Sequence, residues 1–372
     1  MRGGVMTQTA PAPPAAGRAT GWHPLTVGRI DRLTRDTVAL TLDVPEHLAG
    51  TFAHRAGQHV VVRHRLGGTE VRRCYSVCPP PADPARLRLV VRRVSPDGFG
   101  AYAVNWLSVG ERLEVSPPAG AFRLDAAPGT HHVLVAGGTG IAPLLAMAAE
   151  ALRGDPHCRV SLLYACRDTG AVLLAGDLAD LKDTYLSRFT VLYVLSREHR
   201  EAELLSGRID ADRLPRLLAP LGTDAATAFY LCGPWGMVEA ARGALALAGT
   251  PDGQVRVELF STDGAPAAPP EEEPRVAAGD GVRITVRLAD RTSAAEMRPG
   301  DRVLLDAVLR ARPDTPYSCR VGLCGSCRAR VSAGAADLGT QYALSPAELA
   351  AGYTLACRAR PTTPEIALDF DA

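Results

Sequence analysis

Short runs of alternating hydrophobic and polar residues dominate the first third of the chain. Residues 25–44 and 57–65 alternate β-branched or other apolar side chains with polar ones, and Gly, Pro and Asp interrupt the runs. Residues 87–94 and 112–115 continue the pattern. A period of two residues is typical of β-strands that bury one face. This part of the sequence therefore predicts an antiparallel barrel.

Short runs of mostly apolar residues recur in the middle of the chain. Four such runs occupy residues 132–136, 160–164, 190–195 and 228–231, and Ala- and Leu-rich stretches such as residues 142–152 lie between them. Apolar strands that alternate with helices are typical of a sheet buried on both faces. We therefore predict a doubly wound parallel sheet.

A change in composition marks the start of the last part. Residues 262–280 are rich in Ala, Pro and Gly and contain three consecutive glutamates, so they cannot bury a core and are expected to form a linker. Beyond them, residues 281–288 predict a strand and residues 304–311 a helix. The expected fold class is multidomain, with β, α/β and α+β parts. The predicted divisions are a disordered leader (1–21), the barrel domain (22–125), the doubly wound domain (126–260), the linker (261–280) and the C-terminal domain (281–372).

Charge and composition narrow the possible partners. The 41 Lys and Arg residues nearly balance 40 Asp and Glu, and no long run of one sign provides a surface for nucleic acid or a membrane. No stretch is apolar enough for a secretory signal or a membrane span. We expect a cytoplasmic protein with neither a nucleic-acid nor a membrane partner.

Four cysteines near the C-terminus have the spacing of metal ligands. A C-x4-C-x2-C run is followed, after 29 further residues, by a single cysteine, as in plant-type ferredoxins that hold a 2Fe-2S cluster. Gly322, Gly325 and Ser326 are small enough to let the loop wrap closely around such a cluster. A structural zinc site is the alternative, but zinc sites usually carry two C-x2-C pairs. The predicted ligands are Cys319, Cys324, Cys327 and Cys357.

The segment Arg73-Cys74-Tyr75-Ser76, at the end of a predicted barrel strand, combines a positive charge, an aromatic ring and a hydroxyl. Arg73 would pair with a pyrophosphate, the Tyr75 ring would stack on a flavin, and Ser76 would donate a hydrogen bond near the flavin N5. Taken alone, the segment favours an ordinary edge strand with an exposed Arg and Tyr, and the neighbouring motifs described below reverse that preference.

A glycine-rich turn joins the first apolar strand of the middle part to the helix that follows. Residues 137–143 read Gly-Gly-Thr-Gly-Ile-Ala-Pro, and the amides of such a turn, together with the helix dipole, can receive a phosphate. Pro143 stands where the ordinary dinucleotide fingerprint has its last glycine. The turn therefore predicts a dinucleotide site.

Three later strand ends complete the predicted dinucleotide site. Arg167 follows one strand, and Ser196 and Arg197 follow the next, where the adenosine end of a dinucleotide lies in doubly wound sheets. Ser196 and Arg197 suit a 2′-phosphate and favour NADPH, whereas Asp168 could take a free ribose hydroxyl and leaves NADH open. Cys232-Gly233-Pro234 would face the nicotinamide, although the tripeptide alone also describes an ordinary strand-to-helix turn.

Together these motifs resemble the ferredoxin-NADP reductase-like flavoproteins that carry a C-terminal plant-type ferredoxin domain. The resemblance extends from about residue 22 to the C-terminus. Within the family the chain is most similar to the reductase subunits of phenylacetyl-CoA epoxidase complexes. The segments that carry this likeness are Leu25-Thr26-Val27, Gly57-Gln58-His59, Arg73-Cys74-Tyr75-Ser76, Gly207-Arg208-Ile209-Asp210 and Glu348-Leu349-Ala350-Ala351-Gly352-Tyr353.

The resemblance implies a flavin-binding barrel, a nucleotide-binding domain and a β-grasp ferredoxin domain. It implies that Ser76, Thr139 and Cys232 lie where the nicotinamide meets the flavin. Glu258 and Phe260 would lie close to the flavin. The FAD-binding residues that it implies are Arg73, Tyr75, Ser76, Val91, Arg92, Gly98, Gly100 and Ala101. The NADPH-binding residues that it implies are Gly138, Thr139, Arg167, Ser196, Arg197, Cys232, Gly233 and Pro234.

Two segments depart from the family pattern. Gly100 follows Phe99 where the family often has Ser or Thr, so the amides of Gly100 and Ala101 must supply the donors for the flavin phosphates. The nucleotide turn is closer to the general reductase pattern than to the Gly-Ser-Gly-Ile-Thr-Pro of many epoxidase reductases. The identity of the oxygenase partner therefore stays open.

The resemblance implies an electron path from NADPH through FAD and the 2Fe-2S cluster to an oxygenase, most similar to one that epoxidises an aromatic acyl-CoA in phenylacetate catabolism. Another oxygenase, hydroxylase or haem monooxygenase is a second possible acceptor. A scaffold or redox sensor without turnover is a third possibility. No acid–base dyad is expected, because hydride transfer depends on positioning.

Overall fold

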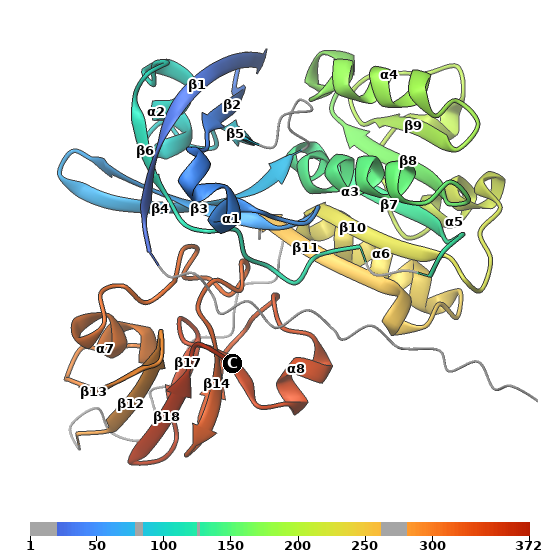
Figure 1. Ribbon diagram of the computed structural model, residues 1–372. Helices are drawn as coiled ribbons and strands as arrows, with labels where there is room; N and C mark the ends of the chain where they lie inside the picture. The colour runs from blue at the N-terminus through green and yellow to red at the C-terminus, as the bar shows by residue number, and fades with distance from the viewer. Residues whose placement is uncertain (1–20, 79–84, 125–126, 262–280) are drawn as a thin grey trace, which may run out of the picture.

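The computed structural model describes residues 21–78, 85–124, 127–261 and 281–372. Nearly all of the predicted leader and linker lies outside these residues. Buried hydrophobic side chains of the described residues form four clusters: one in the barrel, one on each face of the parallel sheet and one in the C-terminal part. Figure 1 shows the arrangement of these three parts of the chain. Among the described helices, none combines the length and the apolar character needed to cross a membrane.

Six antiparallel strands close into a barrel in the order β1-β2-β5-β4-β3-β6, which confirms the predicted barrel. Alternation builds its core: in β5, Leu87, Leu89 and Val91 point inward, while the arginines at both ends of the strand are more exposed. Helix α2 closes the barrel with Phe99. The barrel elements are β1 (His23–Thr34), β2 (Thr37–Asp43), α1 (Ala49–Phe52), β3 (His59–Leu66), β4 (Thr69–Cys78), β5 (Arg86–Arg92), α2 (Phe99–Asn105) and β6 (Arg112–Val115).

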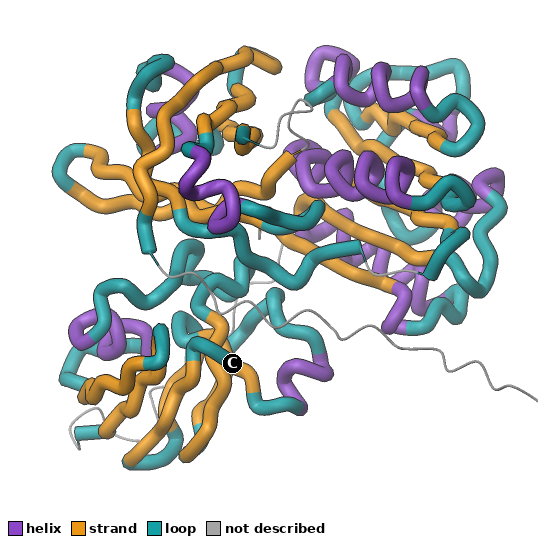
Figure 2. The backbone as a smooth tube through the Cα atoms, in the orientation of Figure 1, coloured by secondary structure: helices purple, strands orange, loops and turns teal. Residues whose placement is uncertain are grey.

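Five parallel strands in the order β11-β10-β7-β8-β9 form the second sheet, with helices on both of its faces (Figure 2). Helices α3 and α4 share a core with one face, and α5 and α6 with the other, which confirms the doubly wound prediction. The elements are β7 (His131–Gly137), α3 (Ile141–Gly154), β8 (Arg159–Cys166), α4 (Ala175–Thr184), β9 (Phe189–Leu195), α5 (Arg213–Leu218), β10 (Ala228–Pro234), α6 (Trp235–Leu247) and β11 (Val255–Ser261).

The C-terminal domain is a mixed sheet in the order β13-β12-β18-β14-β16, packed against α7. Its two N-terminal strands form an antiparallel hairpin, and β12 pairs in parallel with the last strand, which is the predicted β-grasp arrangement. Helix α7 coincides with the predicted helix. The elements are β12 (Arg283–Leu288), β13 (Arg291–Glu296), α7 (Leu304–Ala311), β14 (Arg328–Ala333), β15 (Ala336–Leu338), α8 (Pro346–Ala350), β16 (Tyr353–Leu355), β17 (Ala359–Pro361) and β18 (Glu365–Asp369).

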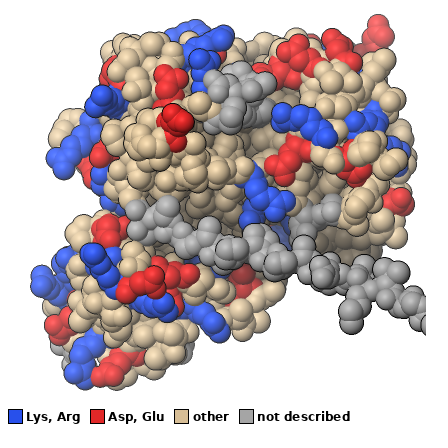
Figure 3. Space-filling model, in the orientation of Figure 1, with Lys and Arg blue, Asp and Glu red and all other residues tan. Residues whose placement is uncertain are grey.

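The C-terminal domain lies against both other domains (Figure 1). Its loop between α7 and β14 reaches the barrel, where Arg72 donates a hydrogen bond to the Thr315 carbonyl. Leu323 and Tyr342 pack against the core of the parallel-sheet domain. Over the face drawn in Figure 3, acidic and basic side chains are interspersed.

Candidate functional site

A cavity of about 350 Å³ opens between the barrel and the parallel-sheet domain. Strands β4, β5 and β11, the start of α2 and the turn before α3 contribute its lining. The cavity therefore brings together segments that are far apart in the sequence. The predicted residues that line it are Arg73, Tyr75, Ser76, Arg92, Gly98, Gly100, Ala101, Thr139 and Phe260.

An aromatic wall forms one side of the cavity. The ring centroids of Tyr75 and Phe99 lie 5.9 Å apart, and Phe99 is almost completely buried. Burial raises the pKa of the Tyr75 hydroxyl, so the side chain stays neutral. A neutral ring held by a buried neighbour suits the stacking of a flavin.

The start of α2 forms the end of the cavity that suits phosphates. A Cβ atom on Gly100 would lie 2.2 Å from the carbonyl oxygen of Arg92, so only glycine lets this turn approach β5. The amides of this turn, together with Arg73 and Arg92, provide donors and positive charge along one edge. These residues fit the diphosphate of FAD and would hold it.

The glycine-rich turn before α3 crosses the Cys232-Gly233 segment directly. A Cβ atom on Gly140 would lie 2.2 Å from the Cys232 carbonyl oxygen, so the two predicted motifs form one close contact. The Tyr164 hydroxyl donates a hydrogen bond of 3.1 Å to the Gly138 carbonyl and fixes the turn from below. The backbone around Thr139 thus lies between the flavin cavity and the sheet.

A buried polar group of three residues lies at the inner end of the cavity. The Ser76 hydroxyl donates to a Glu258 carboxylate oxygen at 3.2 Å, and His59 Nδ1 lies 3.9 Å from the other oxygen. Burial raises the pKa of Glu258 to about 7, although the neighbouring His59 lowers it. Sequence reasoning named Ser76 and Glu258 but missed His59.

Backbone hydrogen bonds join the ends of β8 and β9, where the adenosine part of the dinucleotide is predicted to bind. The amide of Ser196 donates to the Cys166 carbonyl at 2.9 Å, and that of Arg197 donates to the Arg167 carbonyl at 2.6 Å. Arg167 also lies 3.7 Å from Asp36, which pairs with Arg92 at 3.1 Å. Asp36, which sequence reasoning missed, thus links this end to the flavin cavity.

The four predicted ligand cysteines interact with one another through their thiols. Hydrogen bonds, first from Cys324 and then from Cys357, lower the pKa of Cys319, while the interaction with Cys319 raises the pKa of both Cys324 and Cys357. Cys357 also interacts with Cys327. Four thiols close to one another are the donor set that the two iron ions of a 2Fe-2S cluster require.

Backbone geometry supports this loop. Gly322 and Gly325 have φ values of 78° and 64°, which favour glycine, and the Leu323 amide donates to the Cys319 sulfur at 3.3 Å. Within the described residues, no group of three or more His, Cys, Asp or Glu side chains is placed so that it could hold one metal ion. In a 2Fe-2S cluster each iron takes only two of the four thiolates.

Cys74 places the cysteine loop next to the flavin cavity. This residue lines the cavity, and its sulfur lies 3.4 Å from the Ser326 hydroxyl. The same hydroxyl lies 3.5 Å from His59 Nε2. The side chains of Cys74 and Ser326, which contact each other, therefore lie between the predicted flavin site and the predicted cluster site.

Two predicted residues occupy less accessible positions than the sequence suggested. The Val91 side chain is completely buried in the barrel core, which leaves only its backbone for a ligand. Cys232 is also completely buried, beneath Gly140.

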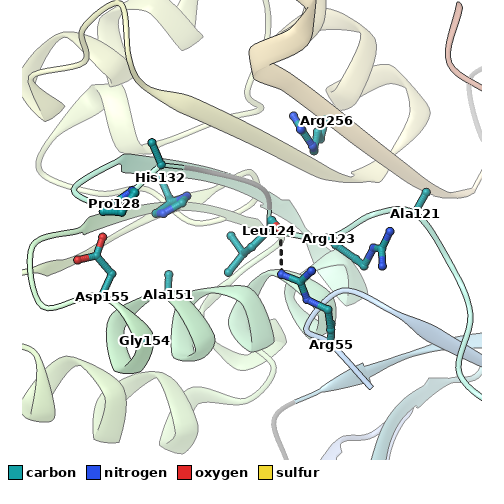
Figure 4. A pocket seen from close by; sticks show the side chains of 11 residues that line it. Arg55, Ala121, Arg123, Leu124, Pro128, His132, Ala151, Gly154, Asp155 and Arg256 are labelled. Carbon is teal, nitrogen blue, oxygen red and sulfur yellow. Dashed lines mark hydrogen bonds between the residues drawn. The ribbon is translucent and has the colours of Figure 1, made fainter. Parts of the chain in front are cut away.

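A second cavity, of about 530 Å³, is shown in Figure 4. It is lined by residues that were not predicted for either site, among them Arg55, Arg123 and His132.

The fold and these sites define a nucleotide-dependent flavoprotein reductase that carries its own 2Fe-2S domain. Family models agree: residues 24–124 match an oxidoreductase FAD-binding domain, residues 134–243 an oxidoreductase NAD-binding domain, and residues 286–362 a 2Fe-2S iron-sulfur cluster binding domain. One subunit of the 1,2-phenylacetyl-CoA epoxidase of Escherichia coli K12 is 36% identical to the chain, over 95% of the chain and 99% of that protein. The chain belongs to the family of that epoxidase component, and is an NAD(P)H-dependent flavin and iron–sulfur oxidoreductase.

Two further similar proteins are named as reductases of oxygenase systems. The ferredoxin reductase component of the 3-ketosteroid-9-alpha-monooxygenase of Rhodococcus rhodochrous is 34% identical, over 93% of the chain and 96% of that protein. Phthalate dioxygenase reductase matches with a TM-score of 0.57 and 25% identity, over 94% and 98% of the two chains. A self-sufficient cytochrome P450 monooxygenase shares the fold, with a TM-score of 0.65 and 24% identity, over 93% of this chain and 41% of that longer chain. FAD, a pyridine nucleotide and a 2Fe-2S cluster are therefore the cofactors of this chain.

Proposed function

We propose that the protein is a cytoplasmic NADPH-dependent reductase that supplies electrons to an oxygenase of the phenylacetyl-CoA epoxidase type. The observation that carries the electron path is the contact of Cys74, which lines the flavin cavity, with Ser326 of the cysteine loop. The choice of oxygenase rests on the 36% identity to the epoxidase component along nearly the whole chain. The protein would then act in phenylacetate catabolism.

When bound, FAD would supply an acceptor for the hydride of the nicotinamide, and the 2Fe-2S cluster would supply a one-electron carrier. The residues of the chain would hold these cofactors in position. We propose that Tyr75 and Phe260 flank the flavin ring, while Arg73, Arg92 and the amides after Gly98 hold the diphosphate.

The residues at the inner end would orient the reacting rings. The Ser76 hydroxyl donates its only proton to Glu258, so it would rotate away from that carboxylate to donate a hydrogen bond to the flavin ring. Thr139 and the Cys232-Gly233 segment shape the place for the nicotinamide, because Gly140 allows their close approach. By excluding water, these buried groups would protect a hydride passing between the bound rings.

The preference for NADPH rests on two arginines near Ser196. Arg167 and Arg197 are joined through their backbones at the ends of β8 and β9, and both side chains are partly or fully exposed. Guanidinium groups suit a 2′-phosphate. We propose that these residues bind the 2′-phosphate of NADPH.

Electron delivery to purified partners tests the proposal. The FAD- and iron-loaded protein, given NADPH, should support turnover of a phenylacetyl-CoA epoxidase oxygenase component and should reduce cytochrome c. If neither NADPH nor NADH reduces the flavin, the proposal of a reductase fails. If the flavin is reduced but the epoxidase receives no electrons, only the choice of oxygenase fails.

A second acceptor is favoured by the ketosteroid relatives. Their identity of 34% over 93% of the chain is close to that of the epoxidase component. The same protein should therefore be mixed in parallel with the oxygenase component of a ketosteroid monooxygenase. Faster NADPH oxidation with that component than with the epoxidase would select this second function.

A further inference from the structure

Arg72 is a buried cation at the boundary between the barrel and the C-terminal domain. Its side chain is only 6% exposed, and its guanidinium carbon lies 4.9 Å from the ring centroid of Trp22 and 4.0 Å from that of Tyr317. Trp22 precedes the first barrel strand, whereas Tyr317 belongs to the C-terminal domain. One guanidinium group therefore contacts aromatic rings from both domains.

The edge of the same guanidinium group is also occupied. Its Nε pairs with a Glu70 carboxylate oxygen at 2.8 Å, and its Nη1 donates to the Thr315 carbonyl across the boundary at 3.4 Å. An arginine can use its flat faces for aromatic rings while its edge donates hydrogen bonds, which a lysine cannot do. The site is therefore specific for arginine.

Two further arginines extend the stack at its ends. Arg63 lies over Trp22 at 4.3 Å and Arg320 over Tyr317 at 4.9 Å. Each is held by a carboxylate, from Glu114 at 2.8 Å in the first case and from Asp306 in the second. We name these five residues the interdomain stack: Arg63, Trp22, Arg72, Tyr317 and Arg320. Cation–π contacts gain strength where water is excluded, as it is at Arg72.

The interdomain stack lies beside the path between the two cofactor sites. Arg72 stands two residues before Cys74, and Tyr317 stands two residues before the ligand Cys319. Cys74 in turn contacts Ser326 of the cysteine loop. The stack is thus only two residues away from the flavin cavity on one side and from the cysteine loop on the other.

We propose that Arg72 is a positioning residue for electron transfer from the flavin to the cluster. The inference rests on the proposed function, because it presupposes that electrons cross this boundary. In each transfer one electron leaves the reduced flavin and one ferric ion of the cluster becomes ferrous. Protons released by the flavin pass to solvent. Electron tunnelling weakens steeply with distance, so a loosened boundary slows this step and leaves hydride transfer unchanged.

Anaerobic stopped-flow spectroscopy of the fully loaded protein separates the two steps. With Arg72→Ala, flavin reduction by NADPH should stay near the wild-type rate, while the subsequent reduction of the cluster slows by about 10-fold or more, as expected when buried cation–π contacts are lost. Arg72→Lys should slow it less. Arg65→Ala, which removes an exposed arginine from neighbouring strand β3, serves as the matched control and should behave as wild type.

A structural readout complements the rates. Hydrogen–deuterium exchange of the Thr315 and Tyr317 amides should be faster in Arg72→Ala than in wild type, with the iron content and the cluster's electron paramagnetic resonance spectrum unchanged. Trp22→Leu, which removes one face of the stack without touching the C-terminal domain, should give the same pattern and replaces Arg72→Ala if that variant does not fold.

The outcomes separate this inference from the proposed function. The positioning role of Arg72 is overturned if Arg72→Ala and Trp22→Leu both reduce the cluster and exchange amide hydrogens at wild-type rates. If Arg72→Ala does not fold, the same result in Trp22→Leu alone overturns it. Failure of the wild-type flavin to be reduced by NADPH or NADH would instead overturn the proposed function.

Discussion

Three of the four predicted cluster ligands lie within residues 319–327, whereas the flavin cavity takes its lining from three strands and two helix starts in two domains. Bound iron would hold the cysteine loop, but the walls of the cavity are held by packing and hydrogen bonds. A local site of this kind tolerates changes elsewhere in the chain. A dispersed site depends on glycines, buried acids and domain contacts, and therefore offers more ways to fail.

Removal of one ligand should give the largest effect and should be confined to the cluster. Cys327→Ala deletes a buried ligand, so the variant should lose the cluster's iron and visible absorption while NADPH still reduces the flavin. Iron analysis and absorption spectra measure the loss. Cys158→Ser, at a buried cysteine of the parallel-sheet domain, is the control and should keep its iron. A full iron content in Cys327→Ala would contradict the ligand assignment.

The buried acid of the flavin cavity should make stability depend on pH. Because Glu258 has a pKa of about 7 in the folded protein and 4.5 ordinarily, the folded state holds the proton more tightly between these values. Its contribution is present below pH 4.5 and is lost as pH rises toward 7, on the order of 3 kcal/mol.

Urea unfolding of flavin-free protein at several pH values measures this effect. His59, Cys74 and Ser76 also face Glu258, so the comparison with Glu258→Gln isolates the carboxyl group. The wild-type midpoint should fall from pH 5 to pH 7.5, and Glu258→Gln should flatten that fall. Equal slopes in the two proteins would rule out a raised pKa.

Close backbone approach at the nucleotide turn should make Gly140 intolerant of a side chain. Gly140→Ala pushes a methyl group against the Cys232 carbonyl, so it should cost about 1–3 kcal/mol of stability and slow flavin reduction by NADPH. Gly236→Ala in α6, where a Cβ atom meets open space, should be neutral or stabilising. Thermal unfolding and stopped-flow traces compare the two, and equal behaviour would refute the close contact.

Nucleotide choice should show the smallest effect. Arg197→Ala removes one charged contact to a 2′-phosphate, so the KM for NADPH should rise by about 10-fold while the KM for NADH stays constant. Arg200→Ala, at an exposed arginine three residues further on, is the control. Steady-state kinetics with both nucleotides decide the point, and an unchanged ratio of the two KM values would exclude the role of Arg197.

Local signals were readable in the sequence. The cysteine spacing and the glycine-rich turn lie within short segments, and the structure places them in the expected loop and strand-to-helix turn. Strand β11 was missed although its signal is present: Val255, Val257 and Leu259 alternate with Arg256 and Glu258. Such alternation differs from the apolar runs of the other strands in this sheet.

Long-range contacts were not readable in this way. Cys74 and Ser326 are 252 residues apart, and Arg72 meets Tyr317 only because two domains dock. Asp36 and His59 are ordinary polar residues in the sequence and gain their roles from neighbours on other strands. Such pairs depend on tertiary packing, which periodicity and motif spacing do not encode.

Anaerobic titration of the loaded protein with NADPH tests most directly whether electrons pass from the nucleotide through the flavin to the cluster. The account predicts that the flavin absorption bleaches and that the electron paramagnetic resonance signal of a reduced 2Fe-2S cluster appears in the same sample, whereas Cys327→Ala shows bleaching alone. A bleached flavin beside an intact cluster that stays oxidised, with NADPH in excess, would contradict it.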